Sequence, residues 1–168
     1  MFGSHLSIAG NMSNALREAE GLGLDTVQVF TKNQRQWRFT PLADEVEAEW
    51  KSEVARLGWE GRVVAHDSYL INLASPDDAL WEKSIGLMAE EFERCRRLEI
   101  PYLVSHPGAH TGSGVDAGLV RIAKAYKRLL KDSRGSGVTL CLENTAGGGS
   151  TLGRTFEELA LLADLIHE

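Results

Sequence analysis

The sequence has few cysteines and no long apolar run. Its 168 residues include two cysteines, Cys95 and Cys141, which stand far apart in apolar segments. This excludes a disulfide framework and a metal site built on paired cysteines, so we expect both thiols to be small core residues in a reducing, cytoplasmic compartment. No apolar stretch approaches the roughly 18 residues of a membrane span. The first ten residues also lack the pattern of a signal peptide.

Positive charge is in short supply as well. Lys and Arg number 18 against 24 Asp and Glu, which gives a formal net charge of -6. Such a balance argues mildly against nucleic acid as a ligand, because affinity for DNA comes largely from cations on phosphates. A local basic loop or a bound metal ion can still reverse the sign where a ligand sits. The composition, 43% hydrophobic and 25% charged, is ordinary for a globular protein, and without any linker we expect one domain, 1–168.

Short apolar runs alternate with helical patterns five times along the chain. The alternation predicts βαβ units with right-handed crossovers, and strands of nearly continuous apolar residues are typical of a parallel sheet covered on both faces. We therefore expect an α/β fold, doubly wound or of TIM-barrel type. About five of the eight β/α units of a complete barrel are present. The expected strands are 1–6, 26–30, 62–66, 101–106 and 138–143, and the expected helices are 11–22, one from Pro41, one around 81–95, 119–130 and one from 155.

Three consecutive predicted strands end in residues that bind metals, namely His66, His106 and Glu143. Neighbouring strands lie about 4.8 Å apart, so side chains at their carboxyl ends can converge on one ion. Two imidazoles and a carboxylate suit zinc and leave a fourth position for water. A lone histidine at a strand end is more often structural, but three such residues in succession favour a metal site.

The loops after these strands combine basic and apolar residues. TKNQRQWR contains Lys32 and Arg35, and DSYLINLAS places Tyr69 and Leu70 in a loop. Taken singly, the first fits a solvated loop and the second a loop packed into the core. Together on the metal face they suit a distorted nucleic acid, in which bulky side chains unstack bases while arginine holds phosphate.

Four segments together resemble the endonuclease IV family. They are TKNQRQW at 31–37, HDSYLINLA at 66–74, HPGAH at 106–110 and ENTAG at 143–147, in the family's order. The resemblance runs from the first strand to the last residue. It implies a TIM barrel of which this chain is the N-terminal part. It also implies a DNA-repair hydrolase that cleaves the phosphodiester 5′ to abasic sites in double-stranded DNA, by zinc-activated hydroxide.

The resemblance also assigns roles at the metal site. His66 and His106 would bind one zinc ion, and Glu143, the expected catalytic residue, would bridge it to a second of the family's three. We expect His5 to support a metal ligand from beside it, and His110 to be an ordinary loop residue. One zinc site is thus complete on the protein side, whereas the family's later ligands have no counterpart in these 168 residues.

A second set of residues is expected to contact DNA. Arg35, Tyr69 and Leu70 match family residues that enter the duplex at the lesion and keep the abasic sugar flipped out. Lys32 and Gln34, in the same loop as Arg35, are further expected contacts.

The missing ligands lead us to expect weak activity or none from these residues alone, and self-association through open barrel edges. A sugar isomerase or epimerase with a similar metal-binding barrel is one alternative function, although a small sugar has no need of arginine and apolar wedges. The other alternative is a damaged-DNA-binding fragment without catalysis.

Overall fold

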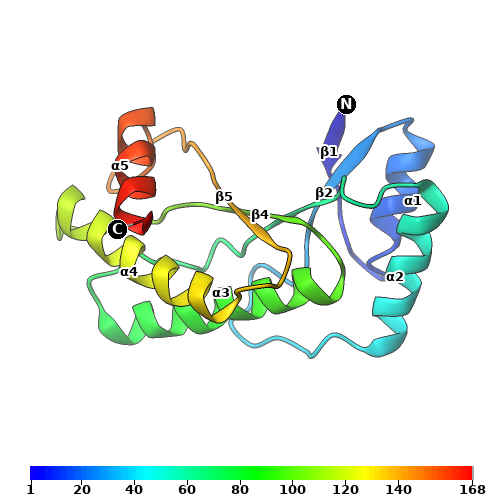
Figure 1. The fold of residues 1–168 in the computed structure, drawn as a ribbon, viewed down its shortest axis with the longest axis horizontal. Coiled ribbons are helices and arrows are strands. Elements are labelled where there is room, and N and C mark those ends of the chain that lie inside the picture. Colours follow the sequence, from blue (N-terminus) through cyan, green and yellow to red (C-terminus); the bar gives the residue numbers. More distant parts are fainter. Residues whose placement is uncertain (168) are drawn as a thin grey trace.

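The computed structural model describes residues 1–167 as a five-stranded parallel sheet with five helices (Figure 1). The strands stand in the sheet in chain order, β1-β2-β3-β4-β5, and each pairs in parallel with the next. This order confirms the α/β prediction and selects the TIM-barrel type, because a doubly wound sheet reverses its order. The elements are β1 (Gly3–His5), α1 (Asn14–Gly21), β2 (Thr26–Phe30), α2 (Asp44–Leu57), β3 (Val64–His66), α3 (Asp78–Arg97), β4 (Tyr102–Ser105), α4 (Val115–Asp132), β5 (Thr139–Leu142) and α5 (Phe156–His167).

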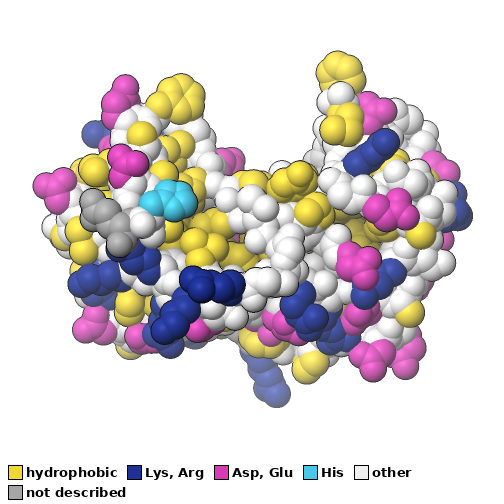
Figure 2. All heavy atoms as spheres, in the orientation of Figure 1, with side chains coloured by type: hydrophobic (Ala, Val, Ile, Leu, Met, Phe, Trp, Pro, Cys, Tyr) yellow, Lys and Arg dark blue, Asp and Glu magenta, His cyan; other side chains and the backbone are white. Residues whose placement is uncertain are grey.

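The helices form an arc around the sheet. In Figure 1, α1 and α2 lie to the right, α3 runs along the bottom, and α4 and α5 lie to the left, so that the upper side between α5 and β1 carries no helix. Figure 2 shows hydrophobic side chains in the depression on this side. The described residues therefore form an open part of a barrel.

Strand register separates the sheet into two faces. Residues such as Val27, Val29, Ala65 and Leu103 are buried under the helices. Their sequence neighbours point to the other face, which is partly exposed along all five strands. The prediction that both faces are covered is thus wrong for the inner face of the described sheet. Cys141 lies on that face and is half-buried, whereas Cys95 is a core residue as expected.

Two helices begin later than the sequence pattern predicts. Asn11 Oδ1 accepts a hydrogen bond from the Ser13 amide at 2.8 Å, so residues 11–13 form a turn and α1 begins at Asn14. The second helix was expected from Pro41, but Ala43 is extended and α2 begins at Asp44. The backbone before α2 is held against α3, since the carbonyl of Leu42 accepts a hydrogen bond from the Arg97 guanidinium at 2.9 Å.

One hydrophobic core links all the helices to the outer face of the sheet. Trp50 of α2 is fully buried, and its indole N–H donates to the carbonyl of Leu98 at 3.2 Å. Tyr126 of α4 and Leu162 of α5 are fully buried as well. No helix of the described residues combines the length and the apolar character needed to cross a membrane.

Two adjacent leucines of α5 test how this core extends to the last helix. Leu162 is 0% exposed and Leu161 is 48% exposed. Leu162→Ala should lower the free energy of unfolding by about 2–5 kcal/mol, because it leaves a cavity. Leu161→Ala should cost about 0.5 kcal/mol or less, as is usual for surface positions. Urea denaturation followed by circular dichroism measures both, and equal costs would contradict this position of α5.

Candidate metal centre

The parallel register brings three ligand-type side chains to one end and one face of the sheet. His66 pairs with Val104, and Val104 pairs with Cys141. Side chains alternate between faces along a strand, so His106 and Glu143, each two residues further on, point the same way as His66. The expected convergence of these residues therefore follows from the pairing of β3, β4 and β5.

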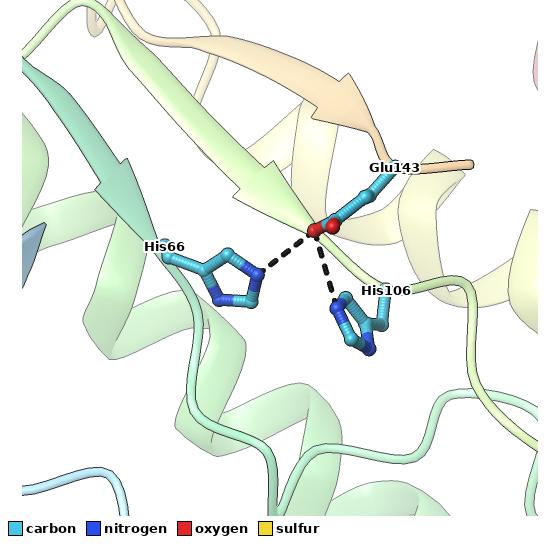
Figure 3. A group of neighbouring side chains, drawn as sticks. All are labelled: His66, His106 and Glu143. Carbon is cyan, nitrogen blue, oxygen red and sulfur yellow. Dashed lines mark hydrogen bonds and ion pairs between the residues drawn. The ribbon is translucent and has the colours of Figure 1, made fainter. Parts of the chain in front are cut away.

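The three side chains meet around one carboxylate oxygen (Figure 3). Glu143 Oε2 lies 2.9 Å from His66 Nε2 and 3.1 Å from His106 Nε2. Within the described residues 1–167, these form the one group of three or more such side chains whose ligand atoms all lie within 4.8 Å of one another. His66 is buried, whereas the side chains of His106 and Glu143 are 37% and 39% exposed. The group is thus open on one side.

The hydrogen bonds of His66 show what this group is suited to hold. Its Nδ1 lies 2.8 Å from the backbone oxygen of Asp67, which can only accept, so Nδ1 carries the proton. In the neutral ring Nε2 is then a bare acceptor, and it faces another acceptor, the Glu143 carboxylate. A proton or a metal ion between the two would relieve this opposition of acceptors. Two imidazoles and a carboxylate fit zinc by donor type, and a backbone acceptor behind a ligand is the usual way to set its tautomer.

The protonation state of His106 fits the same use. Burial lowers the pKa of His106, and the nearby Glu143 carboxylate opposes this by raising it. A lowered pKa keeps the imidazole neutral near pH 7, and neutral imidazole is the form that binds metals.

A buried polar chain lies behind β3 and β4. Ser105 Oγ donates to Asp67 Oδ2 at 2.6 Å, so the Tyr126 hydroxyl, 2.8 Å away, donates to Ser105. Burial raises the pKa of Asp67 well above its usual range, although the hydrogen bond from Ser105 lowers it. These hydrogen bonds join Asp67, the residue after His66, to Ser105, the residue before His106. The sequence did not predict them, because its pattern assigns Ser105 to a strand and Tyr126 to the helix core.

The two loops expected to contact DNA lie side by side next to the metal ligands. Ser68 Oγ donates to the backbone oxygen of Gln34 at 2.9 Å, which joins the loop after β3 to the loop after β2. Tyr69 is 63% exposed, and its ring centroid lies 5.4 Å from that of His66 and 5.6 Å from that of His106. Arg35 is exposed and Leu70 is half-buried. An aromatic ring therefore borders the candidate metal centre, and the loop that carries Arg35 is joined to the loop that follows His66.

Lys32 was expected to contact DNA, but its side chain turns into the protein. Its side chain is only 5% exposed, and its ammonium pairs with the buried carboxylate of Glu91 on α3. A buried, paired ammonium is not presented to a ligand, so Lys32 supports its loop from inside and we do not retain it among the expected DNA contacts. Gln34 is half-buried, and the contact described above engages its backbone.

The two remaining histidines near this end of the sheet take different positions. His5 lies 6.3 Å from His66 between ring centroids, and its Nδ1 is 3.1 Å from Gln28 Nε2. Burial lowers its pKa, with a smaller contribution from His66. His5 thus lies beside His66, and its supporting role stays a prediction. His110 Nδ1 accepts from the amides of Gly112 and Gly114 and so organises its own loop.

Asn72 joins the loops that follow β3 and β4. Its Nδ2 donates to the backbone oxygen of Ala109, while its Oδ1 accepts from the amides of Ala109 and Ala74. The backbone passes closely here, since a Cβ on Gly108 would lie 2.7 Å from Asn72 Oδ1. Asn72 belongs to the HDSYLINLA segment, but nothing in the local pattern assigns it this linking role.

The chain is similar in sequence to a known protein family and to several curated proteins. Residues 16–168 match the family described as xylose isomerase-like TIM barrel. A protein of Chloroflexus aurantiacus named probable endonuclease 4 is 52% identical over 99% of this chain and 59% of its own length. One of Methanoculleus marisnigri with the same name is 41% identical over 98% of the chain and 58% of its own length. The chain thus spans about three fifths of these curated relatives.

Solved structures agree with the fold. Endonuclease IV from Thermus thermophilus superposes with a TM-score of 0.80 at 36% identity, over 96% of this chain and 58% of that one. An L-ribulose 3-epimerase reaches a TM-score of 0.77 at 18% identity, over 99% of this chain and 57% of that chain. The second likeness shows the fold alone.

The close approach at Gly108 predicts a stability difference between two glycines. Gly108 and Gly112 both have positive φ, 117° and 104°, but no heavy atom lies within 4 Å of a Cβ on Gly112. Both alanine substitutions carry backbone strain, and Gly108→Ala adds a clash with Asn72. We expect Gly108→Ala to be less stable than Gly112→Ala by about 1–3 kcal/mol, the usual cost of overpacking. Urea midpoints of the two variants measure the difference, and equal midpoints would contradict it.

Proposed function

The chain belongs to the xylose isomerase-like TIM barrel family, and from that premise we propose that it is part of a DNA-repair endonuclease of the endonuclease IV type. The proposed reaction is hydrolysis of the phosphodiester 5′ to an abasic site in double-stranded DNA, assisted by zinc. One observation carries the proposal. Two imidazole nitrogens and a carboxylate converge beside the exposed ring of Tyr69, and the loop that carries the exposed Arg35 adjoins that of Tyr69.

We assign the metal to His66, His106 and Glu143. Zinc bound there would supply Lewis-acid chemistry, polarising a phosphoryl oxygen and making water a stronger acid. His66 offers Nε2 because its Nδ1 proton is held by the backbone oxygen of Asp67. Glu143 would neutralise part of the charge of a bound ion, and its partial exposure leaves the group open to a phosphate. We therefore keep Glu143 as the proposed catalytic residue.

The exposed residues around the metal ligands are assigned to the DNA. The Tyr69 ring, next to both histidines, would stack on a base beside the lesion and so hold the abasic sugar out of the duplex. Arg35 would bind a backbone phosphate, as arginine does at kinked DNA. Leu70 follows Tyr69 and would widen the same wedge. Arg35 and a bound zinc ion would together supply local positive charge for DNA in a chain whose net charge is -6.

The fold by itself does not decide between this function and that of the epimerases, because one barrel serves many reactions. The loops favour the nuclease, since a small sugar gains nothing from an exposed tyrosine beside the two histidines or from an exposed arginine in the adjoining loop. We further propose that residues 1–168 act as one domain, because one core joins the described helices to the sheet.

Metal binding gives the first test of this proposal. The purified chain should bind one equivalent of zinc, measured by calorimetry and by metal analysis after gel filtration. His66→Ala should weaken zinc affinity by more than about a hundredfold, because even outer partners of metal ligands are worth about 10–100-fold. His167→Ala, an exposed histidine of α5, is the matched control and should bind zinc normally. Equal affinity in the two variants would remove this site from the proposal.

Binding of an abasic duplex gives the second test. The chain with zinc should prefer a duplex with one abasic-site analogue over the same duplex without it. Tyr69→Ala should weaken the affinity for the abasic duplex by about 1–3 kcal/mol, the usual value of stacking one base on an aromatic ring. Tyr102→Ala is the control, because Tyr102 is also exposed but begins β4, at the end of the sheet away from the metal ligands.

The same mixtures test cleavage. We expect a nick 5′ to the lesion, slower than with a full-length relative, because these residues offer ligands for a single ion. The nick should disappear with a chelator and in His66→Ala, which separates it from contaminating nucleases. Binding without any nick would favour a damaged-DNA-binding module, and epimerisation of a ketose without binding of abasic DNA would overturn the nuclease proposal.

A further inference from the structure

The 31–40 loop, which carries Arg35, is tied at its base to buried charges of helix α3. Thr31 and Lys32 begin the loop directly after β2, and both are buried. Most of the residues that follow, Arg35 among them, are exposed. The loop therefore has a fixed base under an exposed tip.

Arg94 of α3 holds both ends of this loop. Its Nε and Nη2 donate to the backbone oxygen of Thr31 at 3.0 and 2.6 Å, and its Nη1 donates to the backbone oxygen of Thr40 at 3.2 Å. The side chain is 8% exposed, and Glu90, one turn earlier on the helix, lies 3.6 Å from it. The planar guanidinium thus bridges two carbonyl oxygens nine residues apart, which the single ammonium of lysine could not do in the same geometry.

Glu91, three residues before Arg94, binds the start of the loop. One carboxylate oxygen accepts from the Thr31 hydroxyl at 2.6 Å, and the other pairs with the Lys32 ammonium. Glu91 is 1% exposed, so the pair is shielded from water. Replacing a buried ion pair by apolar residues is often neutral or stabilising, so stability alone is a poor reason for such a pair. Its effect here is to direct the side chain of Lys32 inward and the rest of the loop outward.

We infer that Arg94 and Glu91 are positioning residues that set the shape of the 31–40 loop and thereby the place of Arg35 at the substrate. The inference rests on the proposed function for the part that concerns DNA. Neither residue is one of the three side chains of the candidate metal centre, and both make hydrogen bonds to the loop. The loop is further supported by Ser68 at Gln34 and by Lys83 of α3, whose ammonium lies 4.2 Å from the Trp37 ring centroid. A recognition residue held by a rigid element in this way is pre-organised for its ligand.

The experiment uses Arg94→Lys, which keeps the buried charge and loses the fork. Arg96→Lys is the matched control, because Arg96 lies on the same helix, is half-exposed and makes its salt bridge with Glu93 on the surface. Hydrogen exchange measured by mass spectrometry should show faster exchange of the amides in residues 32–39 in Arg94→Lys, with the rest of the chain unchanged. Arg96→Lys should exchange like the parent chain.

The second part of the experiment measures the affinity of the same variants for the abasic duplex. Arg94→Lys should weaken it about tenfold or more, as small displacements of binding groups do, while zinc affinity stays unchanged. In a chain that already carries Arg35→Ala, Arg94→Lys should cause little further loss, because coupled residues are non-additive. A purely structural role would instead lower zinc binding too, or add its full loss to that of Arg35→Ala.

The outcomes separate the inference from the proposed function. Unchanged exchange in residues 32–39 would overturn the positioning role, whatever the DNA result. Faster exchange with a fully additive loss of affinity would overturn the link through Arg35. If the parent chain does not prefer abasic DNA, the proposed function fails, and exchange alone decides whether α3 holds the loop. Should Arg94→Lys not fold, Thr31→Val removes the hydrogen bond to Glu91 in a side chain of the same shape and should accelerate exchange in the same segment.

Discussion

The candidate metal centre depends on the parallel register of β3, β4 and β5. Because the three strands are parallel, their carboxyl ends lie at the same end of the sheet. The alternation of side chains along each strand then turns His66, His106 and Glu143 to one face. A slip of one residue in any pair would turn one ligand to the helix-covered face and separate it from the others. The register is protected by the core on that other face, where Ala65 and Leu103 are fully buried. Apolar packing on one side of the sheet therefore fixes the chemistry on the other.

Polar groups inside the molecule extend this order to the loops. The chain from Asp67 through Ser105 to Tyr126 joins β3 and β4 to α4, and the charges of α3 hold the loop after β2. Buried polar groups cost free energy unless they are hydrogen-bonded or ion-paired. Each network is therefore stable in the one arrangement that pairs all its members. As a result, the exposed side chains of Tyr69 and Arg35 project from two adjoining loops whose backbones are held in place.

The barrel and the site contribute differently to function. The fold is shared with sugar epimerases at identities below 20%, so its helices and strands say little about the reaction. What distinguishes this chain is the content of the loops at the carboxyl ends of the strands. There an exposed aromatic ring stands over two imidazoles and a carboxylate.

The sequence by itself determined the α/β alternation, the five strands to within a few residues and the three residue types that converge at the strand ends, because strand ends and hydrophobic periodicity are local properties. It also placed Tyr69 and Arg35 in loops. Only the tertiary structure decided that Lys32 turns inward to Glu91, that one face of the sheet stays partly exposed and that Arg94 closes the loop at Thr31. Arg94 and Thr31 are 63 residues apart, and no local pattern records which distant partner a buried charge will meet. Such pairings arise only when the helices pack on the sheet and exclude water from the groups between them.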